Sequence, residues 1–201
     1  MKKVIFFGTG GHMKEQVEWL KDLMDYKKVK YDIVLCSEKK IYKGYDIISE
    51  KKIKKNTGQL YLAIGDPKIR SKLISKFRNY NFFSLIHPSA IISKKAKIGK
   101  GVCISPNCII TSNSKIGNFN NLNCGVYVHH DTIIGDNNTF SPGAKILGNC
   151  KIGNSNFFGS NSCIKENIKI GNNNVVGASS FLNINLGNNL KVGGVPAKNI
   201  Y

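Results

Sequence analysis

The stretch KIGNFNNLNCGVYVHHDTIIGDNNTFSPGAKILGNCKIG, residues 115–153, has an apolar residue at every sixth position. The same period extends in both directions without a polar residue. Its positions are Ile86, Ile92, Ile98, Ile104, Ile110, Ile116, Leu122, Val128, Ile134, Phe140, Ile146, Ile152, Phe158, Ile164, Ile170, Val176 and Leu182. Six is not a multiple of the roughly 3.6 residues in a helical turn, and the Gly and Asn residues in between would break a helix. The pattern predicts short strands.

A second period of 18 residues lies inside the first. Gly follows the apolar residue at Gly99, Gly117, Gly135, Gly153 and Gly171. Asn repeats at the same interval at Asn120, Asn138, Asn156 and Asn174. Three hexads then make one turn of a triangular prism, in which each face contributes a short parallel strand. We expect the glycines to let the corners turn and the asparagines to hydrogen-bond along the stack.

Before residue 86 the pattern changes to strands that alternate with helices. Strands are predicted at Val4–Phe7, Ile33–Leu35 and Leu60–Ile64. One helix is predicted to bury Met13, Val17, Leu20 and Met24, and a second helix carries Ile69, Leu73, Ile74 and Phe77. Such strand and helix units build a small parallel sheet. The sequence thus predicts a Rossmann-like α/β half over residues 1–85, followed by an all-β domain over residues 86–201.

The first predicted strand leads into Gly8-Thr9-Gly10-Gly11-His12. Glycines here would let an anion approach the backbone, and the following helix would present its free N–H groups to a phosphate. A tight turn without a ligand is the alternative. Met13 replaces the third glycine of the dinucleotide-binding pattern, and about 85 residues cannot form both halves of a dinucleotide domain. An NAD-dependent oxidoreductase is therefore excluded.

Composition limits the class of protein. The chain has 201 residues, is 41% hydrophobic and has a net charge of +18. Residues 1–100 hold 23 of its 30 Lys and Arg and 9 of its 12 Asp and Glu, which leaves them at +14. This charge favours acidic partners such as nucleotide or coenzyme phosphates, although a solvated lysine-rich surface is an equal alternative. The sequence has no apolar run long enough to span a membrane or to form a secretory signal, and its six cysteines form no CxxC pair. We expect a cytoplasmic protein.

One polar cluster in the repeat contains residues suited to acid–base catalysis. His129, His130 and Asp131 place a titratable base beside a carboxylate, which can fix the tautomer of the histidine and raise its basicity. A metal site is the competing interpretation. Adjacent strand residues face opposite ways, so the three side chains would not close on one ion, and no metal is expected. The sequence also has no GxSxG elbow, so serine hydrolase chemistry is favoured still less.

Two sets of motifs resemble known families. The hexapeptide spacing resembles the left-handed β-helix acyltransferases, whose active sites usually lie between the subunits of a trimer. GTGGH, AIGDPKIR at 63–70 and LIHPSA at 85–90 resemble bacterial sugar acetyltransferases that join a small α/β domain to such a helix. These families include the NeuD-type sialic acid O-acetyltransferases and the N-acetyltransferases of nucleotide-linked 4-amino-4,6-dideoxy sugars.

The resemblance implies a role for particular residues. His130 would be the general base, Asp131 its partner, and Gly148, one coil later, the backbone donor to the oxyanion. Residues near the acceptor nucleotide would be Gly10, Gly11, His12, Ser37 and Gly65. Residues that match the acetyl-CoA groove are Thr139, Ser160, Ala178 and, in a GxPAK-like loop, Lys198. For Lys198, a solvated tail lysine is an equal alternative.

The resemblance also implies a reaction, namely N-acetylation of a nucleotide-linked amino sugar by acetyl-CoA for surface glycan biosynthesis, in a homotrimer. O-acetylation of a sugar hydroxyl is the alternative reaction. A noncatalytic basic β-helix, acting as a scaffold or binding nucleic acid, is a different class of function. The alternation of aromatic and basic residues that an RNA platform needs is absent, and neither nucleic-acid binding nor membrane insertion is expected.

Overall fold

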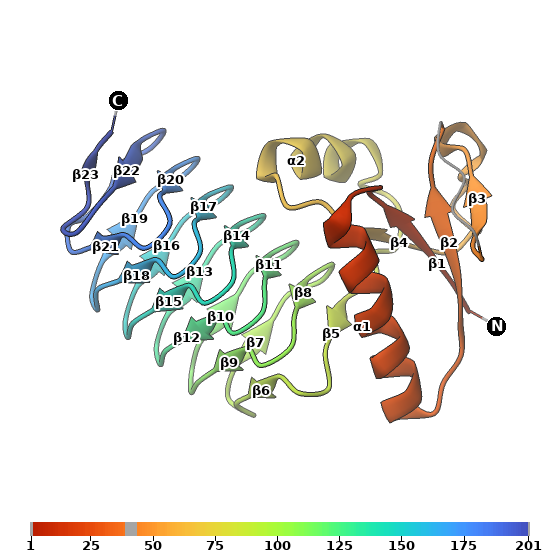
Figure 1. Cartoon of the computed structure of the whole chain (residues 1–201), viewed down its shortest axis with the longest axis horizontal. Coiled ribbons are helices and arrows are strands. Elements are labelled where there is room, and N and C mark those ends of the chain that lie inside the picture. Colours follow the sequence, from red (N-terminus) through yellow and green to blue (C-terminus); the bar gives the residue numbers. More distant parts are fainter. Residues whose placement is uncertain (1, 39–43, 201) are drawn as a thin grey trace.

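The computed structural model describes residues 2–38 and 44–200 and shows an α/β domain beside a stack of coils (Figure 1). The elements of the α/β domain are β1 (Lys2–Phe7), α1 (Gly11–Lys27), β2 (Tyr31–Cys36), β3 (Asp46–Ile48), the 3-10 helix η1 (Glu50–Lys52), β4 (Gln59–Leu62) and α2 (Pro67–Lys76). Its strands form a parallel sheet in the order β3-β2-β1-β4. The predicted strands and helices are confirmed, and β3 was not predicted.

The central strand β1 is buried on both sides, as its unbroken apolar run requires. Val4 and Phe6 pack with α1, while Ile5 and Phe7 pack with Phe77 at the end of α2. Ile69, which the predicted second helix carries, is not part of the core, because it is 51% exposed. The next residue, Arg70, points inward instead and is 2% exposed.

The coils form three parallel sheets, which we call the first, second and third faces. The first face contains β5 (Leu85–Ile86), β8 (Cys103–Ile104), β11 (Asn121–Leu122), β14 (Thr139–Phe140), β17 (Phe157–Phe158), β20 (Val175–Val176), β22 (Lys191–Gly193) and β23 (Lys198–Asn199). The second contains β6 (Ile91–Ile92), β9 (Ile109–Ile110), β12 (Tyr127–Val128), β15 (Lys145–Ile146), β18 (Cys163–Ile164) and β21 (Phe181–Leu182). The third contains β7 (Lys97–Ile98), β10 (Lys115–Ile116), β13 (Ile133–Ile134), β16 (Lys151–Ile152) and β19 (Lys169–Ile170).

The structure confirms the left-handed β-helix and its register. Every predicted hexad residue is the second residue of a strand, and those from Ile104 to Leu182 are buried. Ile116 pairs with Ile98 on one side and Ile134 on the other, so vertical neighbours are 18 residues apart. The last coil is shorter, since Val176 pairs with Val192 after 16 residues. The antiparallel strand β23 then closes the edge beside β22.

Two corners of the prism matter below. The asparagine corner, between the third and first faces, contains Asn120, Asn138, Asn156 and Asn174, which bond to one another along the stack as predicted. The histidine corner, between the second and third faces, contains Ser112, His130, Gly148 and Glu166. The predicted reason for the repeated glycines is wrong. A Cβ at Gly117 would lie 2.5 Å from the carbonyl oxygen of Gly135, so close stacking demands glycine there, and the left-handed turn positions are mostly Asn.

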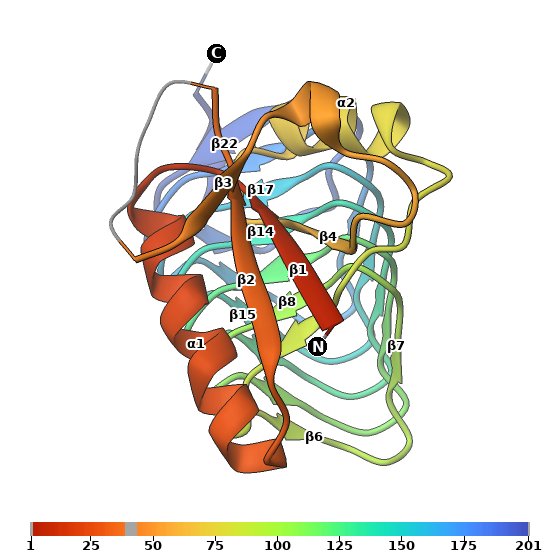
Figure 2. The same ribbon diagram turned by 90° about the vertical axis from the view of Figure 1, so that its right-hand side faces the viewer.

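The α/β domain covers the first face at the start of the stack, where Figure 2 shows it in front of the coils. Leu85 and Cys103 of the first face share a core cluster with Phe6, Tyr61 and Phe83. Because β5 comprises Leu85 and Ile86, the predicted domain boundary falls inside a strand of the first face. Within the described residues, no helix is both long and apolar enough to cross a membrane.

Candidate functional site

His130 and Asp131 form a hydrogen-bonded pair at the histidine corner. Nδ1 of His130 lies 2.9 Å from Oδ2 of Asp131, and Asn113 donates to Oδ1 at 3.1 Å. The contact with His130, and then that with Asn113, lowers the pKa of the Asp131 carboxyl, so it is an anion near neutral pH. A carboxylate on Nδ1 favours the tautomer whose free lone pair is on Nε2. The side chain of His130 is 61% exposed, so that nitrogen is accessible.

Gly148 lies directly beside the imidazole of His130. Asn149 donates its backbone N–H to the carbonyl of His130 at 2.9 Å, which stacks the two coils. A Cβ at Gly148 would lie 2.8 Å from Nε2, so no other residue fits without moving the ring. Among the described residues, the N–H of Gly148 has no backbone partner. His130 is exposed, while Gly148 itself is buried beside the ring. A base next to a backbone N–H suits a reaction in which a proton leaves and an oxyanion forms.

His129 contacts its own face of the β-helix. Its ring centroid lies 4.3 Å from that of Tyr127 and 6.4 Å from that of His130. In the part of the chain that the structure describes, no group of three or more His, Cys, Asp or Glu side chains is arranged to hold a metal ion.

The N-terminus of α1 is open where the sequence predicts a phosphate contact. Gly10 is its N-cap and provides no side-chain cap, and the first turn has no acidic residue. A Cβ at Gly10 or Gly11 would meet nothing within 4 Å, so packing does not require either glycine. Packing does require Gly8, which has φ +125° and approaches Ala63. By contrast, α2 is capped by Asp66, which accepts from the N–H groups of Lys68 and Ile69. Free helical N–H groups are suited to an anion.

His12 faces the β-helix. Its Nε2 lies 2.8 Å from the amide nitrogen of Gln16 and 2.9 Å from that of Asn121 in β11. Burial is the main effect on its pKa, which is lowered, so His12 is neutral near pH 7. It therefore ties the first turn of α1 to the first face and brings no charge to a phosphate.

The β4–α2 loop is tied to the same face by residues that sequence reasoning assigned differently. Thr139, predicted to contact acetyl-CoA, is 4% exposed and donates its hydroxyl to the carbonyl of Gly65 at 2.6 Å. Arg70 donates to the same hydroxyl at 2.8 Å. Sequence reasoning missed Arg70, since a charged residue on a helix is usually exposed.

Ser37, the other predicted loop residue, follows β2 and donates its N–H to the carbonyl of Ile48 at 3.1 Å.

The remaining predicted coenzyme residues lie along the corner between the first and second faces. Ser160 and Ala178 occupy neighbouring coils there, and the carbonyl of Ser160 accepts from the N–H of Ser179 at 2.7 Å. Lys198 is exposed in β23, opposite Gly193 of β22. These positions follow one edge of the stack, as an extended ligand would require.

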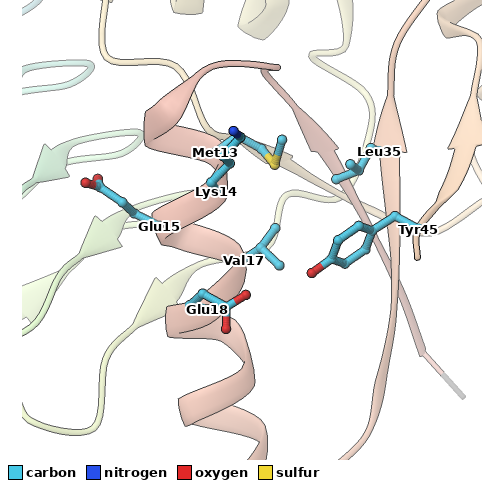
Figure 3. Close-up of a pocket in the computed structure, with 7 residues that line it drawn as sticks. All are labelled: Met13, Lys14, Glu15, Val17, Glu18, Leu35 and Tyr45. Atoms are coloured by element: carbon cyan, nitrogen blue, oxygen red, sulfur yellow. The ribbon is translucent and has the colours of Figure 1, made fainter. Parts of the chain in front are cut away.

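A cavity of about 450 Å³ lies along α1 on the side that faces β2 (Figure 3). Met13, Val17 and Leu35 make it apolar, and Tyr45 closes the opposite side. Glu15 and Glu18 are its acidic residues. Lys14 also lines the cavity, so its charged residues are one cation and two carboxylates. This mainly apolar cavity suits a phosphate less well than the open turn of α1.

Within one chain the predicted residues form separate groups. The loops of Gly10, Ser37 and Gly65 belong to the α/β domain, which contacts the first face and the asparagine corner. His130 lies at the histidine corner, which is opposite the first face of the prism. The acceptor loops and His130 of one chain therefore lie on different sides of the prism.

Comparisons with known proteins agree with this architecture. Residues 3–77 match the PglD N-terminal domain, and residues 113–148 and 149–183 match the bacterial transferase hexapeptide family of six repeats. A search of curated proteins gives no match.

Several solved structures match both domains together. A point mutant of perosamine N-acetyltransferase from Caulobacter crescentus, in complex with CoA and GDP-perosamine, has 27% identity and a TM-score of 0.87, covering 100% of this chain and 98% of that one. WeeI from Acinetobacter baumannii AYE has 25% identity and a TM-score of 0.89, covering 100% of both chains. The acetyltransferase domain of PglB from Neisseria gonorrhoeae FA1090 has 24% identity and a TM-score of 0.90, covering 100% of both, and supports the fold. The chain belongs to the bacterial hexapeptide-repeat transferases that carry a PglD-type N-terminal domain.

Proposed function

We propose that the protein transfers an acetyl group from acetyl-CoA to the amino group of a nucleotide-linked 4-amino-4,6-dideoxy sugar. The observation that carries the proposal is the pair of His130 and Asp131 with Gly148 packed against the imidazole ring. The perosamine N-acetyltransferase, which binds CoA and GDP-perosamine and matches this chain over its full length, supports the class of donor and acceptor.

The chemistry needs no covalent enzyme intermediate. The sugar nitrogen attacks the thioester carbonyl, which forms the N–C bond, and Nε2 of His130 takes the proton that the nitrogen loses. The oxygen of the tetrahedral intermediate becomes negative, and the N–H of Gly148 donates to it. When the C–S bond breaks, the imidazolium returns its proton to the sulfur and CoA leaves as the thiol. Asp131 stabilises the imidazolium in between.

The active unit in this proposal is a homotrimer, since one chain separates the base from the acceptor loops. A neighbouring subunit would bring its own α/β domain to the histidine corner. The outer surface of the second face supports such packing, because several of its outward side chains are apolar. They are Ile91, Ile109, Tyr127, Cys163 and Phe181, and Ile91 is 65% exposed. Lys145 interrupts this row between Tyr127 and Cys163. Apolar side chains that point outward from a face are typical of an interface.

We place the reaction in the cytoplasm, where acetyl-CoA and nucleotide sugars are available. All six cysteines are free thiols, and burial raises the pKa of Cys108 to about 12, which makes that thiol unreactive. Free thiols of this kind are typical of a reducing compartment.

The test is an assay of CoA release. Purified protein is incubated with acetyl-CoA and a panel of UDP-, GDP- and dTDP-linked 4-amino sugars, with the 4-hydroxy sugars as matched controls. Thiol release with an amino sugar, and a hydroxylamine-resistant acetyl product, would support N-acetylation. Release with hydroxy sugars and a hydroxylamine-labile product would support O-acetylation instead. No release with any acceptor would contradict an acetyltransferase of this class.

A further inference from the structure

Arg70 is an arginine buried without a carboxylate. It lies on α2 and is 2% exposed. Within residues 2–38 and 44–200, no ion pair includes it. Burial lowers its pKa to about 10, so the guanidinium is still charged at neutral pH. A buried charge with no counter-ion needs other strong contacts to be tolerated.

Neutral oxygens satisfy its N–H groups. Nε donates to the side chain of Asn137 at 2.9 Å, and Nη2 donates to the carbonyls of Asn137 and Asn138 at 2.9 and 3.0 Å. Nη1 donates to Thr139 and to the carbonyl of Ile64, both at 2.8 Å, with a longer contact to Gly65. The planar fork of arginine, which has five donors, is thus fully used.

These contacts join the β4–α2 loop to one coil of the β-helix. On the loop side the acceptors are the carbonyls of Ile64 and Gly65, and on the coil side they lie within residues 137–139. Two more bonds cross the same junction, from the Thr139 hydroxyl to Gly65 at 2.6 Å and from the Asn137 amide to Pro67 at 2.9 Å. Residues 137–139 follow His130 by no more than half of an 18-residue coil. The loop is therefore fixed to the β-helix of its own chain. Its place relative to a base from a neighbouring subunit then depends only on how the β-helices pack together.

We propose that Arg70 is a positioning residue that holds the Gly65 loop in register with the β-helix, so that the acceptor nucleotide is presented at a fixed place. The inference rests on the proposed function. It also reassigns Thr139 from the coenzyme to the acceptor side of the reaction, as the partner of Arg70 on the loop.

Lysine cannot replace this arrangement. Its ammonium has three donors at one point and no planar fork, so it cannot reach the loop carbonyls and the coil oxygens together. At Thr139, valine has nearly the same shape but no hydroxyl. It removes the shorter of the two bonds to the Gly65 carbonyl and the acceptor of one guanidinium N–H. Serine keeps the hydroxyl and is the matched control. Arg78, an exposed arginine just beyond α2, gives the control R78K.

The experiment measures steady-state kinetics of the full-length protein with the amino sugar on which the wild type is active. For R70K and T139V we expect KM for that nucleotide sugar to rise about tenfold, which corresponds to the loss of about one or two hydrogen bonds. KM for acetyl-CoA should stay within about twofold, and T139S and R78K should resemble the wild type. Circular dichroism and sedimentation of each variant report whether the fold and the assembly are kept.

The possible outcomes distinguish a failure of the positioning role from a failure of the proposed function. If the wild type turns over and folded T139V raises KM for acetyl-CoA instead, Thr139 is a coenzyme contact and the inference is overturned. Unchanged sugar KM in both folded R70K and T139V overturns it as well. If the wild type acetylates no nucleotide amino sugar, the proposed function itself fails, and the positioning role fails with it.

Discussion

Two corners of the β-helix share one backbone geometry and differ in what they repeat. At the asparagine corner the same residue recurs in successive coils and is buried, with Asn156 0% exposed. At the histidine corner four coils carry four different residues, and His130 and Asp131 are exposed. Repetition is favoured where each coil must satisfy the same buried polar groups. Variation is tolerated where water can satisfy the polar groups instead. A functional pair of residues can therefore occupy one coil at the histidine corner without disturbing the stack.

Replacing the base should have the largest effect. We expect H130Q to lower kcat by about 10²–10⁴-fold, because glutamine has similar size but cannot accept the proton. Melting temperature and assembly should not change, since the side chain is exposed. H129Q is the matched control and should retain activity. A turnover by H130Q within about tenfold of the wild type would remove the base from the mechanism.

Gly148→Ala tests the contact between neighbouring coils at the same corner. The new Cβ would lie 2.7 Å from Cε1 of His130 and would displace the ring. We expect kcat to fall by about 10–100-fold in a folded protein, because small misplacements of a catalytic group are costly. Gly187→Ala, where a Cβ meets nothing within 4 Å, is the control. Equal activity in the two variants would show that the ring can move freely.

Asn156→Ala tests the buried corner. Asn156 donates to Asn138 and to the carbonyl of Gly171, and it accepts from the N–H of Asn174 at 2.8 Å. Its loss should lower the free energy of unfolding by about 1–3 kcal/mol for each buried group left unpaired. Asn154, on the exposed side of the same corner, also bonds along the stack, since it accepts from the N–H of Asp136 at 2.6 Å. Water can replace that bond, so equal losses of stability in N154A and N156A would contradict the comparison.

The smallest effect concerns His12, which is half-buried, rather than the exposed His130. Because burial lowers the pKa of His12 in the folded protein, the unfolded chain binds a proton more readily. Stability should be full above about pH 6.5 and should decrease as the pH falls below that value. Urea unfolding between pH 8 and pH 5 would measure the slope. The variant H12N should reduce it, and an identical slope would assign the effect to other groups.

The sequence predicted most of the β-helix because a period constrains every coil at once. A hexad residue in the wrong register would put a polar side chain into the axis, so the positions from Ile104 to Leu182 admit one winding. The short last coil escaped prediction, since its Leu186 and Val192 leave the 18-residue spacing. In the α/β domain, β3 has only three residues, none of them fully buried, and gives no clear alternation.

Contacts in the candidate site were predictable only between residues that the 18-residue period makes neighbours. His130 and Gly148 are 18 residues apart, so their contact follows from the winding. The roles of His12, Arg70 and Thr139 depend on how two domains meet, and no local pattern encodes that contact. From sequence alone, a threonine on a strand is expected at a surface and an arginine on a helix is expected in solvent. In the structure, Arg70 and Thr139 hydrogen-bond to each other. The assignment of the other site residues stays a prediction.

The short antiparallel strand β23 has a consequence for assembly. A stack of parallel coils ends in unpaired N–H and C=O groups, onto which another stack could grow into a fibre. At the C-terminal end of the first face, β23 reverses direction beside β22 and presents Lys198 and Asn199, both exposed. The α/β domain blocks the same face at the opposite end. Both ends of the first face are thus covered, which hinders another stack from pairing with that face end to end.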